Sequence, residues 1–204
     1  ETSREAAVNE QGAAMDFRLS DAQVELAAGA RKFAESALNR DLERRDARGS
    51  YDDAEWRSIW KDCAEFGLLG LCVPQEFGGS GHDAVTAAAI LHAVGYGCRD
   101  NGLTLAINAQ LWTIIMPILE FGTPEQKARY IGPLIRGDWI GADAVTEQKS
   151  GSNAMSPATT AVKEGRGYIL NGEKSLIGQA SGCDFALVFA ATDPGAGSWG
   201  VSAF

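Results

Sequence analysis

Residues 139–174 read WIGADAVTEQKSGSNAMSPATTAVKEGRGYILNGEK, and within them the hydrophobic period changes from helical to strand-like. A short apolar run leads into Thr146 and Glu147, and a glycine-serine turn is predicted at Gly151-Ser152-Asn153. Glycine permits close approach of a ligand to the backbone, and hydroxyls and N–H groups around such a turn can hold a phosphate or a carbonyl oxygen. The stretch is therefore a candidate ligand-binding segment, although Gly-Ser turns also serve as plain connectors in β domains.

The half of the chain beyond Asp138 is predicted to be a β domain. Short runs separated by Gly, Asn, Asp and Pro are typical of strands, and such runs cover residues 140–145, 159–163, 168–170, 174–177 and 185–190. Hairpin turns are expected at residues 164–167 and at Asn171-Gly172. Residues 201–204 are apolar and no turn follows them, so we expect the sequence to stop inside a strand and to be a fragment.

The half before Trp139 is predicted to be helical. The capping box Ser20-Asp21-Ala22-Gln23 starts a first amphipathic helix. Asp52 or Asp53 should cap a second helix, which ends at Gly67. Further helices are predicted over residues 84–94, 103–119 and 124–136.

Local signals refine this helical half. Pro117 should bend the fourth helix or end its regular hydrogen bonding, and Thr123 caps the fifth. The charged run 40–48 is interpreted as a solvated connection, because alternating signs at a helix end favour one. The glycine-rich residues 77–81 lack the lysine of a phosphate-binding loop and are predicted to be a plain loop.

Composition excludes several classes of protein. The chain has 204 residues, of which 45% are hydrophobic, so it can bury a core. Its formal net charge of −9 argues against nucleic acid and against an anionic membrane as partner. We find no apolar stretch of about 18 residues for a membrane span and no signal-peptide pattern. Residues 1–14 are interpreted as a disordered extension or an expression scar, with Met15 as a natural start.

Cysteine and histidine give no sign of a disulfide or a metal site. The cysteines show neither CxxC nor Cys-His spacing, so we expect them to be reduced and mostly buried in a cytoplasmic protein. They are Cys63, Cys72, Cys98 and Cys183. His82 and His92 have no acidic cluster beside them, and we predict no metal site.

Further motifs surround the opening stretch in a fixed order. They read LLGLCVPQEFGGSG at residues 68–81, GTPEQK at 122–127, NGEK at 171–174 and GVSAF at 200–204. Together they resemble the acyl-CoA dehydrogenase family from about Phe17 to the last residue. The resemblance implies an α+β fold: an N-terminal helical bundle, residues 15–137, followed by the first part of a middle β-barrel domain, residues 138–204. The family's C-terminal four-helix domain, which this sequence lacks, would follow and mediate dimer or tetramer contacts.

The resemblance also implies an activity. Family members are flavoproteins that remove the α proton and the β hydride of an acyl thioester, and the hydride goes to flavin N5. FAD is therefore the expected cofactor, an acyl-CoA or acyl-carrier-protein thioester the expected substrate, and an electron-transfer flavoprotein or another acceptor the expected partner. The family's catalytic base belongs to the C-terminal domain, so no glutamate here is nominated for that role; Glu147 resembles a structural position.

Site residues follow from the same resemblance. The flavin-binding segment corresponds to residues 143–152 and a second flavin contact to residues 176–178, which together assign Ala144, Val145, Thr146, Ser152, Leu176, Ile177 and Gly178 to the cofactor. Ser152 also matches a serine near the acyl-thioester ligand. Leu105, Asn108 and Trp112 match positions that line the acyl pocket. We hypothesise that Trp112 restricts the ligand to short or branched acyl groups; the alternative is a tryptophan that fills a buried helix face.

The sequence departs from the family pattern at several positions. Residues 176–178 are Leu-Ile-Gly where the family usually has Trp-Ile-Thr, which removes an aromatic wall and a hydroxyl near flavin N5. Residues 148–150 are Gln-Lys-Ser in place of Pro-Gly-Ala, and Asn153 replaces Asp. The leading hypothesis is a divergent flavin-dependent acyl-thioester dehydrogenase. The alternative is a non-redox partner subunit or binding protein in a hetero-oligomer, and the acidic charge argues against a nucleic-acid-associated relative.

Overall fold

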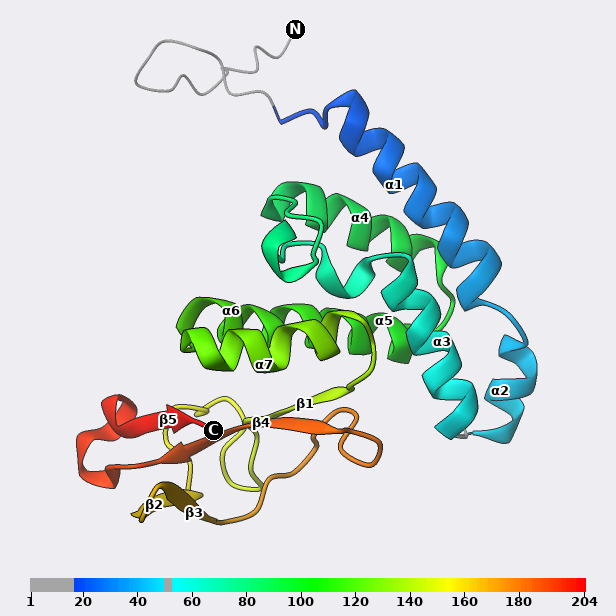
Figure 1. Ribbon diagram of the computed structural model, residues 1–204. Coiled ribbons are helices and arrows are strands. Elements are labelled where there is room, and N and C mark those ends of the chain that lie inside the picture. Colours follow the sequence, from blue (N-terminus) through cyan, green and yellow to red (C-terminus); the bar gives the residue numbers. More distant parts are fainter. Residues whose placement is uncertain (1–16, 50–52) are drawn as a thin grey trace, which may run out of the picture.

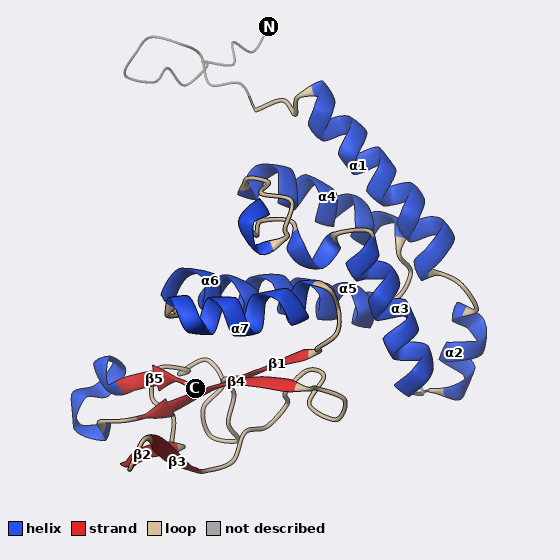
Figure 2. Cartoon of the chain, in the orientation of Figure 1, coloured by secondary structure: helices blue, strands red, loops and turns tan. Residues whose placement is uncertain are grey.

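Our computed structural model describes residues 17–49 and 53–204, which form a helical part and a β-sheet (Figures 1 and 2). Helices form the chain as far as residue 135, and a sheet follows from residue 141. This arrangement confirms the predicted α+β class, with the helices first. Residues 1–14, Met15 and Asp52, for which we predicted a tail, a start and a helix cap, lie outside the described residues.

The first helix starts where the capping box predicts. Ser20 Oγ accepts a hydrogen bond from Gln23 N at 3.3 Å, and Gln23 Oε1 accepts one from Ser20 N at 2.9 Å, so two N–H groups without helical partners are satisfied. Helix α1 covers Asp21–Phe33, and a π-type turn over Ala34–Leu38 extends it. It packs on α4 (Ala84–Gly97), where the absence of a Cβ at Gly97 lets the two backbones approach.

The charged run 40–48 is mostly exposed, as predicted for a solvated connection, but it is helical and one of its arginines is buried. It forms α2 (Leu42–Arg48), which places Leu42 and Arg45 in the interior. Arg45 Nη2 donates to Leu38 O at 2.8 Å, and the guanidinium lies 4.0 Å from the Asp100 carboxylate. A buried cation persists where it is paired and hydrogen-bonded, and a pattern of alternating charges does not reveal which arginine has such partners.

Helix α3 (Asp53–Glu65) buries one face, with Ile59, Trp60 and Cys63 all at most 5% exposed. The glycine-rich segment that follows is a loop around a short 3₁₀ turn, as predicted. It folds back on residues 70–73, because Ser80 N donates to Gly70 O and Gly81 N donates to Val73 O, each at 2.9 Å. These N–H groups are occupied by backbone, so they are not available to a phosphate.

One continuous helical rod runs through the centre of the molecule. It consists of α5 (Asn101–Asn108), a π-type segment (Ala109–Ile115) and α6 (Met116–Phe121). Met116 N bonds to Leu111 O directly before Pro117, which has no N–H, so the regular α-helical bonding is interrupted near the proline as predicted. By length and composition alone the rod is long and apolar enough to cross a membrane, a test that core helices of folded proteins also pass; 44% of its most apolar window is buried inside the described part of the chain.

Gln110 ties this rod to the rest of the molecule. Its side chain is fully buried, its Nε2 donates to Leu134 O at 3.2 Å and to Trp139 O at 3.1 Å, and its Oε1 accepts from Gly141 N at 2.8 Å. Leu134 belongs to α7 (Pro124–Ile135), which starts at the predicted Thr123 capping box. Gly141 opens the sheet, so one amide joins two helices and a strand.

The sheet runs in the order β1-β4-β2-β3, and β5 pairs with β4. Its strands are β1 (Gly141–Ala144), β2 (Thr160–Glu164), β3 (Gly167–Asn171), β4 (Phe185–Ala191) and β5 (Val201–Ala203). β1 and β4 are parallel, with Gly141 opposite Phe185, and β2 and β3 form the predicted antiparallel hairpin around residues 164–167. In Figure 1 the α6–α7 layer lies over β1 and β4.

Two predictions for the β half were wrong. Residues 174–177 are not a strand, because Leu176 has a left-handed φ of 56° and Lys174 turns inward. Asn171-Gly172 is not a hairpin turn, because β3 pairs only with β2 and the chain leaves the sheet after Asn171. Gly172 is instead required by a close approach: its φ is 159°, and a Cβ there would lie 2.6 Å from Thr159 Cα.

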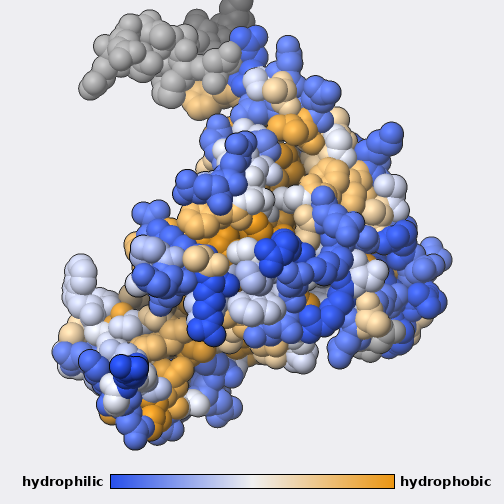
Figure 3. Space-filling model, in the orientation of Figure 1, coloured by the Kyte–Doolittle hydropathy of each residue, from blue (hydrophilic) through white to orange (hydrophobic). Residues whose placement is uncertain are grey.

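Surface and reactive groups complete the fold. All four cysteines are free thiols, of which Cys63 and Cys98 are buried and Cys72 and Cys183 are half-buried. Within residues 17–49 and 53–204 no group of three His, Cys, Asp or Glu side chains lies close enough to hold a metal ion. Apolar surface is visible over the sheet at the lower left of Figure 3. The exposed apolar side chains of β2 and β3 are Val162, Tyr168, Ile169 and Leu170.

Candidate functional site

The two predicted cofactor segments meet at the carboxyl end of β1. Residues 144–146 end and follow this strand, and residues 176–178 lie in the connection between β3 and β4. Ser175 N donates to Thr146 O at 2.9 Å, and Lys174 Nζ donates to Val145 O at 3.0 Å. The structure therefore brings together two segments that are some 30 positions apart in the sequence.

A buried ion pair fixes this junction. Lys174 Nζ lies 2.9 Å from Glu147 Oε1, and the two side chains are 11% and 5% exposed. Glu147 also accepts hydrogen bonds from Ala158 N at 2.6 Å and from Thr159 N at 2.9 Å. Burial alone would raise the pKa of Glu147, but the hydrogen bonds from Thr159, Lys174 and Ala158 outweigh it and lower this pKa to about 2. Glu147 is thus a permanent carboxylate that joins three loop segments.

The loop after Glu147 turns earlier than predicted. Glu147 N bonds to Ser150 O and Ser150 N to Glu147 O, each at 3.1 Å, so the tight turn comprises residues 147–150 and not Gly151-Ser152-Asn153. Ser150 Oγ donates to Asn153 O at 2.5 Å, which ties the following bend to the turn. Ser152 is exposed on that bend, and a Cβ added at Gly151 would meet no atom within 4 Å. A ligand can therefore approach the backbone here.

The second segment presents an apolar side chain in an unusual conformation. Leu176 has a left-handed φ and is 94% exposed, Ile177 is half-buried, and Gly178 has open space where a Cβ would lie. A left-handed leucine costs about 1–2 kcal/mol, and such residues concentrate at ligand-binding sites. The conformation aims an apolar surface away from the protein, where a planar ligand can contact it.

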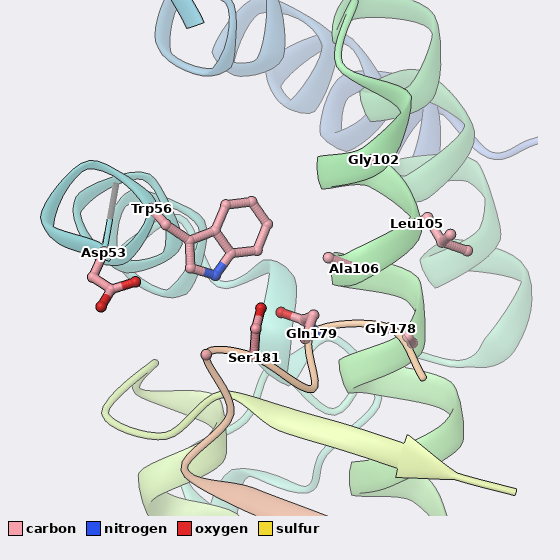
Figure 4. Close-up of a pocket in the computed structure, with 10 residues that line it drawn as sticks. Asp53, Trp56, Gly102, Leu105, Ala106, Gly178, Gln179 and Ser181 are labelled. Carbon is pink, nitrogen blue, oxygen red and sulfur yellow. The ribbon is translucent and has the colours of Figure 1, made fainter. Parts of the chain in front are cut away.

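A cavity of about 400 Å³ adjoins this segment (Figure 4). Trp56 of α3 lines one wall of the cavity, and Leu105 and Ala106 of α5 line the other. Gln179 and Ser181, in the loop 178–182, close the cavity. Figure 4 shows the ring of Trp56 on one side and the α5 residues on the other, with Ser181 and Gln179 between them. The lining is mostly apolar with a few polar groups, which is typical of a small-molecule site.

The predicted acyl-pocket residues divide between this cavity and the helix beyond it. Leu105 lines the cavity together with the predicted cofactor residue Gly178. Asn108 and Trp112 lie one and two turns further along the rod and are half-buried. The Asn108 side chain donates to Thr104 O at 2.8 Å, and Trp112 packs partly on the core of the helical layer. Ala144 is 6% exposed, so it offers a ligand little but its backbone.

Comparison with known proteins gives the family. Residues 20–138 match the N-terminal domain of acyl-CoA dehydrogenases, and residues 142–204 match the middle domain. The chain belongs to the acyl-CoA dehydrogenase family. It spans about half or less of the length of the curated relatives that it matches.

Three similar proteins place the chain within the acyl-CoA dehydrogenase family. An L-prolyl-[peptidyl-carrier protein] dehydrogenase of Pseudomonas fluorescens is 41% identical over 146 residues, which cover 71% of this chain and 38% of the relative. An acyl-CoA dehydrogenase of Bacillus subtilis is 40% identical over 144 residues, 71% of this chain and 38% of the relative. The solved structure of PigA with FAD and proline has a TM-score of 0.87 and 36% identity, over 93% of this chain and 49% of that one.

Two residues of this candidate site were not predicted from the sequence. Lys174 is the cation that joins the two cofactor segments, and the only local signal for it was the NGEK motif of residues 171–174. Gln179 has a left-handed φ of 64° and donates from Nε2 to Gly141 O at 3.2 Å, while its buried Oε1 has no hydrogen-bond partner. No local pattern announces that contact, because its partner lies 38 positions away.

Proposed function

We propose that the protein is an FAD-dependent dehydrogenase that introduces an α,β double bond into an acyl thioester. The observation that carries the proposal is the junction of residues 144–146 with residues 176–178, which Glu147 and Lys174 hold together beside an apolar cavity. The residues present suit a planar, anionic cofactor. Open backbone at Gly151 and Gly178, the Thr146 and Ser152 hydroxyls and the exposed Leu176 supply close approach, donors and apolar contact.

Bound FAD would accept the hydride from the β carbon, while the α proton passes to a base and the C–C bond becomes double. Residues of this chain would bind and orient the reactants. Val145 and Thr146 would contact the edge of the flavin ring system, and Leu176 would contact the apolar face of the ring. Ser152 would contact the phosphate or the thioester. Glu147 is unsuited to be the base, because a carboxylate with a pKa of about 2 scarcely accepts a proton at neutral pH.

The substrate and partners belong to the same proposal. Relatives named for the L-prolyl-carrier-protein and for acyl-CoA favour a thioester of a carrier protein or of CoA. We further propose an electron-transfer flavoprotein or another acceptor as partner, and a homodimer or homotetramer in the cytoplasm, with residues 15–137 and 138–204 as separate domains. Mixing the full-length protein with a candidate acceptor tests the partner, and sedimentation tests the oligomeric state. Limited proteolysis tests the domain division, and cell fractionation tests the location.

The spectrum of the purified full-length protein is the first test of the function. We expect bound flavin in the absorbance spectrum, and we expect anaerobic addition of one of a panel of acyl thioesters to bleach it. A colourless protein that does not take up added FAD contradicts the proposal. That result would favour the alternative, a non-redox partner subunit, for which the missing ring at Leu176 and the missing hydroxyl at Gly178 are the supporting observations.

Trp112 provides a test of acyl-chain length. If its half-buried ring limits the pocket, Trp112→Ala should shift the preferred acyl thioester by two or more carbons and raise kcat/KM for the longer chain about tenfold, since each buried methylene is worth roughly 0.8 kcal/mol. The measurement is kcat/KM across a chain-length series. An unchanged preference with lower stability would mean that Trp112 only fills the helical core.

A further inference from the structure

Asp143 is a carboxylate on the face of β1 that lies against the central rod, and neither the buried ion pair nor the cavity described above uses it. Gly141 faces the central rod, since a Cβ there would lie 2.7 Å from Ile114 Cδ1. Side chains two residues apart share a face of a strand, so Asp143 faces the rod as well. Asp143 is half-buried, and its Oδ1 is buried without a hydrogen-bond partner.

The side chains around Asp143 leave this oxygen unpaired. The Thr113 hydroxyl comes near the carboxylate, but its O–H donates to Ala109 O at 2.8 Å. In residues 17–49 and 53–204 no lysine, arginine or histidine forms an ion pair with Asp143. Burial raises the pKa of the Asp143 carboxyl, as expected where no cation compensates the loss of water.

Asp143 also lies on the route that an acyl group would take. Leu105, Asn108, Ala109, Trp112 and Thr113 recur at spacings of three and four and are all at least partly exposed, so they form one stripe along the rod. The stripe begins at the cavity, which Leu105 and Ala109 line, and reaches Thr113 two turns later, roughly 11 Å along the axis. Three residues after Asp143 the chain reaches Thr146, the proposed contact to the cofactor.

We propose that Asp143 binds a protonated amine on the acyl group, so that the substrate class is an amino-acyl thioester. This inference rests on the proposed function and adds the chemistry of the acyl part. An ammonium group supplies both the missing hydrogen-bond donor and the missing positive charge, whereas a plain alkyl chain would leave a half-buried carboxylate against apolar groups. Thr113 and Trp112 would form the adjoining wall.

The test compares two thioesters of the same ring size. Prolyl thioester carries a secondary ammonium, and cyclopentanecarbonyl thioester is the same ring without nitrogen. Both are assayed with the full-length protein and with its Asp143→Asn variant, which keeps the shape of the side chain and removes its charge. Glu164→Gln, at an exposed acid of the same sheet, is the matched control.

We expect Asp143→Asn to lower kcat/KM for prolyl thioester about 10- to 100-fold and to change it less than threefold for the cyclopentane analogue. Glu164→Gln should change neither. An equal loss on both thioesters, or no loss on either, would overturn the inference and leave the proposed function standing. The thermal transition of each variant shows whether an equal loss comes from unfolding.

Failure of the proposed function has a different signature. If the unmodified protein oxidises neither thioester nor any other in the panel, the dehydrogenase proposal falls, and calorimetric titration with the same two thioesters then decides the inference. If Asp143→Asn binds prolyl thioester more weakly than the unmodified protein does, and binds the cyclopentane analogue equally well, the amine site is supported. Equal binding by both proteins overturns it.

Discussion

Glu147→Ala should lower the free energy of unfolding by about 3–5 kcal/mol and abolish retention of the flavin that we propose. The substitution leaves the ammonium of Lys174 buried, with Val145 O as its remaining recorded acceptor, and removes the acceptor of two backbone N–H groups, those of Ala158 and Thr159. The segments at residues 144–146 and 176–178 would then lose the charge that holds them together. Urea unfolding and the flavin absorbance of the purified variant measure the two effects.

An exposed ion pair provides the control for this experiment. Arg31 and Glu35 form a pair at 2.8 Å on the surface of the first helix, with side chains about half exposed. Arg31→Met should cost less than about 1 kcal/mol, because water screens such a pair. Equal losses of stability in the Glu147 and Arg31 variants would contradict the structural role that we assign to the buried pair.

The same carboxylate should make stability depend on acid pH. The pKa of Glu147 is about 2 in the folded protein and about 4.5 when unfolded, so its contribution is fully present above pH 4.5 and is lost as the pH falls toward 2. With about 1.4 kcal/mol per pKa unit, this loss is on the order of 3 kcal/mol. The difference in unfolding free energy between the unmodified protein and Glu147→Gln should therefore shrink between pH 5 and pH 2, and a constant difference would contradict the assignment.

Gly79→Ala should prevent stable folding of the helical layer, with a loss of about 3 kcal/mol or more. A Cβ at this position would overlap with Val73 O and lie 2.5 Å from Val73 Cβ. Val73 O also accepts a hydrogen bond from Gly81 N, which fixes Val73 against this loop, so its atoms cannot move aside as a flexible side-chain end would. The thermal transition followed by circular dichroism measures the loss.

Gly29→Ala is the matched control for Gly79→Ala. Gly29 lies inside α1, and a Cβ there would meet no atom within 4 Å. Alanine is favoured over glycine in a helix by about 0.5–1 kcal/mol, so this variant should be slightly more stable than the unmodified protein. A comparable loss in both glycine variants would show that the steric argument at Gly79 is wrong.

Features encoded by neighbouring residues were predictable from the sequence. The capping boxes at Ser20 and Thr123 fix the starts of two helices, and the change of period after Asp138 marks the start of the sheet. Both depend on side chains that contact their own segment. The motifs of the acyl-CoA dehydrogenase family added the fold and pointed to the two segments that meet at the end of β1.

Features that depend on distant partners were not predictable. The inward turn of Lys174 and the left-handed Leu176 replace a predicted strand, because Glu147 and Val145 bind Lys174 from 27 and 29 positions away. Arg45 was assigned to a solvated run, because the Asp100 carboxylate that lies 4.0 Å from its guanidinium is far away in the sequence. Asp143 looks like one acid among many until the strand places it against the rod.

Buried Gln110 has a dynamic consequence. Since its amide spans the rod, α7 and β1, the amide hydrogen of Gly141 should exchange with solvent only when the helical layer and the sheet separate. A hinge between the two layers would break the two buried hydrogen bonds that join Gln110 to Trp139 O and to Gly141 N, so we expect the two layers to move as one body.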